Sequence, residues 1–209
     1  MSTILKKIFL LGFIAVTVSS CASMNKDECV TANWKNIGYG DGAKGQKVTR
    51  LSQHTSACAK HGVTPNLAQY NAGRSEGLKQ YCTPSTGYNL GVSGKQYNGV
   101  CSNHGESQFK DAIAYGLTVN SAQQKVNALR NEYSNQQNHI SNLKRKIKRS
   151  KKRLLQGKLT ELQAYKLIEK NGKMAVELDR AISGLAPLEG EIADQEQHVS
   201  QLKSQSGFN

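Results

Sequence analysis

The sequence predicts an all-α protein, in which a small, disulfide-stapled, glycine-rich helical domain is followed by an antiparallel helical hairpin or coiled coil. Three observations favour this class. Every cysteine of the 209-residue chain lies before residue 102. Glycines recur four residues apart within the same region, as they do where two helices pack closely. From residue 119 onward, apolar residues recur every seven positions, which is the period of a coiled coil.

The first residues have the pattern of a targeting segment. Two lysines precede an apolar run over residues 8–18, which is shorter than the roughly 20 residues that cross a bilayer and is typical of a signal peptide. The motif Val18-Ser19-Ser20-Cys21 resembles the lipobox of bacterial lipoproteins. The resemblance implies a signal peptide over residues 1–20 and a lipid anchor on Cys21. Because Ala22 follows, it also implies the outer membrane, with the protein facing the periplasm. An ordinary cleaved signal peptide is the alternative.

The other four cysteines predict two disulfides, because an oxidising compartment favours cysteine pairing. Removal of residues 1–20 would leave 189 residues with a net charge of +11. Three pairings of the four cysteines are possible. We favour Cys29–Cys58 and Cys82–Cys101, because antiparallel helices would bring these positions together.

Local signals place four helices between residues 22 and 118, which we expect to form the first domain. Thr49 is a candidate N-cap, and Thr64-Pro65 combines an N-cap with a proline in the first helical turn. Gly62 is expected to end the second helix. The expected helices cover residues 26–44, 49–62, 64–81 and 87–96.

A short glycine pattern repeats within this domain. Residues 38–42, Gly-Tyr-Gly-Asp-Gly, are similar to residues 73–77, Gly-Arg-Ser-Glu-Gly, and Gly91 with Gly94 forms a degenerate third copy. Glycines at positions i and i+4 lie on one helix face, where the missing side chain lets a second helix approach. Each glycine inside a helix costs about 1 kcal/mol relative to alanine. We therefore expect close helix packing and the disulfides to offset this loss.

The cysteines, glycines and aromatic residues of positions 25–118 form an ordered set of motifs. They are Asp27-Glu28-Cys29, Trp34, Gly38-Tyr39-x-Asp41-Gly42-x-x-Gly45, His54-x-x-x-Cys58-x-x-His61-Gly62-Val63-x-Pro65, Tyr70-x-x-Gly73-x-x-x-Gly77, Tyr81-Cys82-Thr83-Pro84 and Gly94-x-x-Tyr97-Asn98-Gly99-Val100-Cys101. This set resembles an uncharacterised family of small proteobacterial envelope lipoproteins, described as a domain of unknown function. The resemblance implies a location in the cell envelope and no particular activity.

Two groups in this domain are candidates for chemistry. His54-x-x-x-Cys58-x-x-His61 has a helical metal-ligand spacing, but we expect Cys58 to be in a disulfide and the histidines to be solvated. Asp41 and Glu76 are candidates for a general acid and base, but their places in the glycine repeat favour roles on the helix surface or in capping. We therefore predict no metal, no cofactor and no catalytic residue.

A third candidate is a ligand groove lined by Tyr39, Tyr97 and Asn98 together with the glycines. Core packing is the favoured explanation for these residues. A hydrolase acting on the cell wall is disfavoured, because the sequence has no nucleophile elbow, no metal cluster and no Cys–His pair outside the expected disulfides.

Residues 119–205 are expected to form the helical hairpin. A turn at residues 155–158 is followed by Thr160-x-x-Gln163, a capping box that opens the returning helix. Pro187 is expected to kink or break this arm. We favour a hairpin over a parallel oligomer formed through the first arm, although an oligomer is possible. The positions of the first seam are Val119, Ala122, Val126, Leu129, Tyr133, Gln136, Ile140, Leu143, Ile147, Ser150 and Leu154, and those of the second are Leu178, Ala181, Leu185, Leu188, Ile192, Gln195, Val199 and Leu202.

One segment of the first arm is strongly basic. Its side chains are candidate contacts for an anion, with the returning Glu161, Glu169 and Glu177 as partial counter-charges. A solvated helix end is the alternative. An envelope location excludes nucleic acid as the partner, and leaves lipopolysaccharide phosphates, anionic phospholipids, cell-wall carboxylates and acidic envelope proteins. The candidates are Lys144, Arg145, Lys146, Lys148, Arg149, Lys151, Lys152 and Arg153.

These observations together favour a non-enzymatic envelope lipoprotein, which is tethered to the membrane by its lipid and contacts an anionic surface or protein through the basic arm. The alternative function is a periplasmic domain that binds a small ligand or inhibits an enzyme, with the coiled coil as a spacer.

Overall fold

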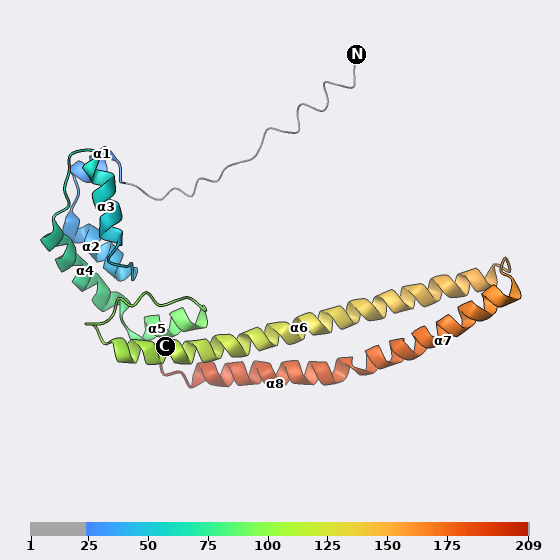
Figure 1. The fold of residues 1–209 in the computed structure, drawn as a ribbon. Helices are drawn as coiled ribbons and strands as arrows, with labels where there is room; N and C mark the ends of the chain where they lie inside the picture. The colour runs from blue at the N-terminus through green and yellow to red at the C-terminus, as the bar shows by residue number, and fades with distance from the viewer. Residues whose placement is uncertain (1–23, 209) are drawn as a thin grey trace, which may run out of the picture. The chain divides into compact units, whose positions relative to one another are not determined.

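The computed structural model describes residues 24–208, and these residues form helices and connecting turns without a β-strand. The all-α prediction is confirmed. The chain divides into two compact units between Tyr81 and Cys82. The first unit contains α1 (Lys26–Val30), α2 (Trp34–Ala43), α3 (Arg50–Ala59) and α4 (Leu67–Tyr81). The second contains α5 (Pro84–Val92), α6 (Glu106–Leu155), α7 (Glu161–Ser183) and α8 (Leu185–Ser204) (Figure 1).

The prediction of a single helix over residues 26–44 is wrong, because the chain forms two helices there. α1 ends at Val30, and the side chain of Asn33 then accepts a hydrogen bond of 3.0 Å from the backbone N–H of Asn36. An asparagine side chain bonded to the backbone in this way competes with helix continuation and begins a new helix. The cap formed by Asn33 therefore separates α1 from α2.

The starts of α3 and α4 also differ from the expectation. Thr49 precedes α3 but makes no capping hydrogen bond with its side chain. α4 begins at Leu67 rather than at Pro65, because Asn66 Oδ1 accepts the backbone N–H of Gln69 at 3.0 Å. Asparagine is a stronger N-cap than threonine, so the later residue sets the start.

Both disulfides have the pairing favoured from the sequence. Cys29 of α1 is bonded to Cys58 of α3, and Cys82 is bonded to Cys101. The first bond lies in the core of the first unit, where Trp34 and Tyr70 pack beside it. Cys29 precedes α2 and Cys58 precedes α4, and these two helices pack closely together. In the same way, Cys82 precedes α5 and Cys101 precedes α6.

In the first unit, α2 and α4 pack with their backbones in direct contact. A Cβ atom added at Gly38 would lie 2.0 Å from the carbonyl oxygen of Tyr70, and one at Gly73 would lie 1.9 Å from the carbonyl oxygen of Lys35. Real Cβ atoms essentially never lie within 3.0 Å of another atom in this way. The predicted role of these glycines in close helix packing is confirmed.

In the second unit, α5 and the start of α6 make the same kind of backbone contact at glycines. A Cβ atom at Gly87 would lie 2.6 Å from the carbonyl oxygen of Phe109, and one at Gly91 would lie 2.2 Å from that of Ile113. A Cβ atom at Gly116 of α6 would likewise lie 2.3 Å from the carbonyl oxygen of Tyr88. The two units therefore share a helix pair whose interface is built on glycine.

The correspondence between the two pairs extends to residue spacing, and it corrects the expected third copy of the repeat. Two glycines in α2 and one just after it are spaced by four and then three residues, and α5 has the same spacing. Gly91 therefore matches Gly42, and Gly94 matches Gly45. Gly45 and Gly94 have φ values of +62° and +63° and end their helices. They lie beyond the last residues of α2 and α5, and the nearest neighbours of a Cβ atom there would be side chains, the Tyr81 ring at Gly45 and Asn120 at Gly94, rather than the backbone of a packed helix. The two glycine series are Gly38, Gly42, Gly45 and Gly87, Gly91, Gly94.

The expected fourth helix, residues 87–96, is displaced toward the N-terminus as α5. The Thr83 side chain caps it by accepting the Thr86 N–H at 3.3 Å, and Pro84 occupies the first turn. Pro84 suits this position because it has no N–H to leave unpaired. Gly94 then ends the helix, so the final residues of the expected span lie outside it.

The long helix α6 forms the predicted antiparallel hairpin with α7 and α8, which run back along it (Figure 1). Every position of the two predicted seams is buried or half-buried, while almost all positions between them on α6 are exposed. α6 ends at Leu155, Gly157 adopts a φ of +64°, and Thr160 with Gln163 makes the capping box.

The break in the returning arm lies at Gly184, between α7 and α8. Pro187 is in the first turn of α8. Its ring excludes the carbonyl of the residue four positions earlier, Ser183, and it has no N–H to donate. α7 therefore ends at Ser183, as the proline predicted.

The domain boundary expected at 118–119 falls inside α6, which is continuous from Glu106 to Leu155 and belongs to the second unit as a whole. Its first three turns complete the glycine contact with α5, and its remainder forms the hairpin. None of the helices within residues 24–208 has the length and apolar character of a membrane-spanning segment.

Candidate functional site

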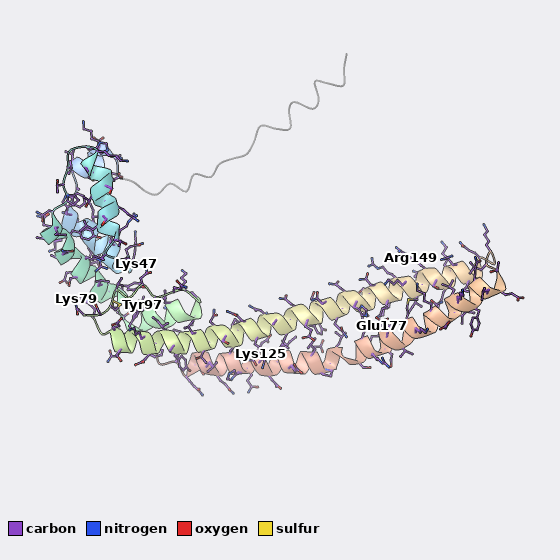
Figure 2. All side chains as sticks on the ribbon, viewed as in Figure 1. Lys47, Lys79, Tyr97, Lys125, Arg149 and Glu177 are labelled. Carbon is purple, nitrogen blue, oxygen red and sulfur yellow. A yellow bond between two sulfur atoms is a disulfide. The ribbon has the colours of Figure 1, made fainter. Side chains whose placement is uncertain are left out.

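The predicted anion-contact residues lie together on the last turns of α6, beside the hairpin turn. Figure 2 shows Arg149 on this part of α6, with Glu177 farther from the turn on α7. All eight basic residues of positions 144–153 are exposed. At 1.5 Å per residue, these charges occupy a helical segment of about 15 Å.

The glutamates of the returning arm do not neutralise this segment. Glu169 is paired with Lys173 of its own helix at 2.6 Å, and Glu177 is paired with His139 at 3.0 Å. Among the described residues, no ion pair joins an acidic side chain to any residue of positions 144–153. Two of the three expected counter-charges, Glu169 and Glu177, thus contact other residues, and no ion pair of the described residues joins Glu161, Glu169 or Glu177 to the basic segment.

The arrangement of these charges also works against the helix that carries them. Lys144, Lys148 and Lys152 are spaced by four residues, and so are Arg145, Arg149 and Arg153. Like charges at this spacing face each other on a helix and destabilise it. An anion bound along the segment would relieve that repulsion.

A groove lies between α6 and α7 within the basic segment. Lys146, Arg149 and Arg153 line it from α6, and Lys170 lines it from α7. Its remaining lining residues are Ser150, Leu167 and Met174. The charge run was evident from the sequence, but the groove depends on the register between two arms and was missed.

A second cluster, buried in the first unit, joins three polar side chains. Asp41 Oδ2 lies 2.9 Å from His54 Nε2 and accepts a hydrogen bond of 2.7 Å from the Tyr70 hydroxyl. Tyr70 is completely buried and His54 nearly so. Burial, and then the hydrogen bond to Asp41, raise the pKa of the Tyr70 hydroxyl above its ordinary value.

This cluster corrects two expectations from the sequence. His54 is buried rather than solvated, whereas His61 is exposed as expected. Cys58 is bonded to Cys29, so its sulfur is not available as a metal ligand beside these histidines. Asp41 is held by His54 and Tyr70, while Glu76 pairs with Lys79 at 2.9 Å on the surface of α4.

The signal that identifies the cluster is the position of Asp41, one residue before a packed glycine on α2. The matched position on α5 is Leu90, and Phe109 of α6 takes the place of Tyr70. The second unit therefore builds the same helix pair with apolar side chains at both positions. The polar cluster is not required by this type of packing.

Tyr39, Tyr97 and Asn98, which were considered as the lining of a groove, belong to different units of the chain. Tyr39 is 45 % exposed on α2 in the first unit. Tyr97, in the second unit, donates a hydrogen bond to Glu106 and accepts one from the Cys101 N–H at 2.7 Å, while its ring packs against Phe109. Asn98 is exposed. For Tyr97, core packing is the role that the structure shows.

The proposed lipid site, Cys21, lies outside the described residues, as does the segment expected to be a signal peptide. Comparison with known proteins bears on the domain that follows. Residues 33–118 match a family described as "Protein of unknown function (DUF2799)".

The matched residues begin at the N-cap of α2 and end two residues beyond Gly116. They therefore contain both glycine-packed helix pairs and leave out the hairpin with its basic segment. The match supports the resemblance to a domain of unknown function. No curated protein matches the chain. No solved structure matches it either.

Proposed function

We propose that this protein is a non-enzymatic lipoprotein of the bacterial cell envelope, whose helical hairpin contacts an anionic envelope surface through the basic end of α6. In this proposal the lipid on Cys21 fixes one end of the chain to the outer membrane, on the periplasmic side. Along the chain, the first unit and the glycine-packed pair of α5 with the start of α6 lie between that anchor and the hairpin.

The observation that carries the proposal is the unneutralised charge at the hairpin turn. Eight cations lie within ten residues, and no acidic side chain of residues 24–208 is paired with them. A protein that only needed a solvated helix end would be better served by charges of both signs, since alternating charges stabilise a helix. Concentrated charge of one sign instead attracts a surface of the opposite sign.

The lipobox motif supports the location and therefore limits the partner. A protein held in the envelope meets lipid phosphates, cell-wall carboxylates and acidic proteins, whereas nucleic acid is in another compartment. Bacterial lipoproteins of this type carry several acyl chains, and more than one chain is needed for stable anchoring. The hairpin does not have to supply the membrane attachment, so a weak and salt-sensitive contact is sufficient.

The proposal is tested by co-sedimentation of the mature chain, with Cys21 replaced by serine, with purified cell-wall sacculi and with vesicles containing phosphatidylglycerol. Binding is measured at low and high salt. The test variant replaces four exposed lysines of the hairpin with glutamine, and the control variant replaces four exposed lysines of the first unit. The test residues are Lys144, Lys148, Lys151 and Lys152, and the control residues are Lys26, Lys44, Lys47 and Lys60.

Both variants lose the same net charge, so a general effect of charge would weaken them equally. The proposal predicts salt-sensitive binding that falls strongly in the hairpin variant and little in the control. Each cation near an anionic membrane contributes about 1 kcal/mol, so the hairpin variant should lose binding by more than about a hundredfold. Equal loss in the two variants, or no binding to either surface, would contradict the proposal.

A further inference from the structure

The groove between α6 and α7 has features that a merely basic surface would not have. It has a volume of about 360 Å³ and its α6 residues lie within the last three turns of that helix. Three of its cations, Lys146, Arg149 and Arg153, are spaced by three and four residues, which places them on one side of α6. Lys170 faces them from α7.

The four cations around the groove are free to bind a ligand. None of them forms an ion pair with another residue of the described chain. Two are arginines, whose planar guanidinium groups bind phosphate and carboxylate oxygens through paired hydrogen bonds. The groove therefore attracts an oxyanion and offers it directed donors.

Ser150 indicates that the groove is a specific binding site and not only a region of positive charge. It lines the groove and is only 7 % exposed, and its Oγ has no hydrogen-bond partner. Buried hydroxyl groups almost always have a partner, because leaving one unsatisfied is unfavourable. A ligand oxygen in the groove would supply the missing acceptor.

The remaining lining residues indicate what else the ligand carries. Leu167 and Met174 of α7 give the groove an apolar side beside its ring of cations. A small hydrophilic anion would leave these side chains unused. An anion attached to a hydrocarbon chain would contact both kinds of surface at once, and methionine adapts readily to the shape of such a chain.

The surroundings of the groove favour a bilayer as the source of this ligand. Leu155 at the end of α6 is 88 % exposed, and Leu162 and Tyr165 in the first turns of α7 are 63 % and 68 % exposed. Apolar and aromatic side chains next to exposed lysines and arginines are typical of segments that lie in a membrane interface. Cell-wall carboxylates and acidic protein surfaces offer no apolar phase to receive them.

We propose that the α6–α7 groove binds the phosphate of an anionic phospholipid. Arg149, Arg153, Lys146 and Lys170 hold the phosphate oxygens, and the Ser150 hydroxyl donates to one of them. The start of an acyl chain lies against Leu167 and Met174, and the exposed side chains at the turn enter the interface. This inference rests on the proposed function, since the groove belongs to the arm that contacts the anionic surface.

The test compares two pairs of substitutions that remove the same charges from the same helix. The groove pair is Lys146→Gln with Arg149→Gln, and the control pair is Arg145→Gln with Lys148→Gln, neither of which lines the groove. Ser150→Ala removes the hydroxyl without changing any charge. Thermal unfolding by circular dichroism verifies that all the variants fold.

Binding of the full mature chain is measured by co-sedimentation with vesicles of phosphatidylcholine that contain phosphatidylglycerol. A second set of vesicles contains oleate at the same surface charge, which replaces phosphate with carboxylate. Inorganic phosphate in solution, without vesicles, is the arm for the free anion, and protection of the groove from hydrogen exchange is its readout. Each vesicle arm is run at low and high salt, because screening removes the general attraction but leaves short-range hydrogen bonds.

The expected result is that the groove pair binds phosphatidylglycerol vesicles at least about tenfold more weakly than the control pair, with the difference persisting at high salt. Ser150→Ala should lose about fivefold, and oleate vesicles should not distinguish the two pairs. Equal loss in the two pairs would overturn the groove while leaving the proposed function intact. Absence of wild-type binding to these vesicles would overturn the groove, and the proposed function would fall with it only if the chain does not bind cell-wall sacculi either. If free inorganic phosphate protects the groove from hydrogen exchange as strongly as phosphatidylglycerol vesicles do, the assignment to a lipid would be overturned.

Discussion

The glycine contact between α2 and α4 allows a sharp prediction about stability. Replacing Gly73 with alanine would place a Cβ atom 1.9 Å from the carbonyl oxygen of Lys35, and 2.7 Å and 3.0 Å from its C and Cα atoms. All three atoms belong to the backbone of α2, so no side chain can rotate away. The two helices would have to separate by more than 1 Å to reach an ordinary contact.

The magnitude follows from two opposing effects. Overpacking a close contact costs up to about 3 kcal/mol, or more where the backbone must move. Alanine returns about 1 kcal/mol through its better helix propensity. Gly73→Ala should therefore lower the free energy of unfolding by about 2 kcal/mol or more. Gly40→Ala is the matched control, because no atom lies within 4 Å of its Cβ position. It should raise stability by about 0.4–1 kcal/mol.

Urea unfolding with the disulfides intact measures both variants. Trp34 is the single tryptophan of the chain and is buried in α2, so its fluorescence reports the unfolding of the first unit. The predicted difference of about 3 kcal/mol corresponds to a midpoint shift of roughly 1 M or more. If the two variants unfold within about 0.5 kcal/mol of each other, the helices are not in backbone contact and the reasoning is wrong.

Three further predictions concern individual side chains. Because the pKa of Tyr70 is raised in the folded chain, the unfolded state loses this proton first as the pH rises. The contribution of Tyr70 to stability should therefore fall by about 1.4 kcal/mol per pH unit above about pH 10. Tyr70→Phe should make the pH dependence in urea titrations shallower by this amount, and burial of Tyr81, whose pKa is also raised, contributes to the dependence that is left. Replacing Cys29 and Cys58 with serine should cost about 3–4 kcal/mol, as followed by Trp34 fluorescence. Ser150→Ala should raise the stability of the hairpin by about 1–2 kcal/mol, measured by far-ultraviolet circular dichroism, while the proposed lipid site predicts weaker lipid binding by the same variant.

The hairpin was predictable because its packing follows a regular period. Seven-residue spacing selects one helix face, and burial of that face is the main energy available to a long polar helix. Even Gln136 and Ser150, which are polar, could be placed in the seam from their positions alone. Pro187 fixed the end of α7 because a proline excludes the carbonyl four residues earlier.

The short helices were predicted less well, because their ends depend on which of several local caps prevails. Thr49 and Thr64 were reasonable N-caps by composition, yet Asn66 sets the start of α4 and Asn33 divides the first helix. The similarity between the two units was missed for a related reason. It lies in the pairing of α2 with α4 and of α5 with α6, whereas the sequence shows only one helix at a time.

Part of the candidate site was likewise predictable from the sequence, and part was not. The charges of residues 144–153 are a property of composition and were identified directly. The groove, and the unsatisfied hydroxyl of Ser150, depend on how α7 is aligned against α6. The buried Asp41–His54–Tyr70 cluster likewise joins three helices, although an acidic residue beside a packed glycine was a usable sign of it.

Hydrogen exchange of the full mature chain locates the contact with the membrane without any substitution. The amides are compared with and without phosphatidylglycerol vesicles, with phosphatidylcholine vesicles as the control. If the hairpin contacts the membrane, protection is expected over the end of α6 and the start of α7, from about residue 144 to residue 174, and none over α1–α4. Protection confined to α1–α5, with the hairpin turn unchanged, would contradict this contact.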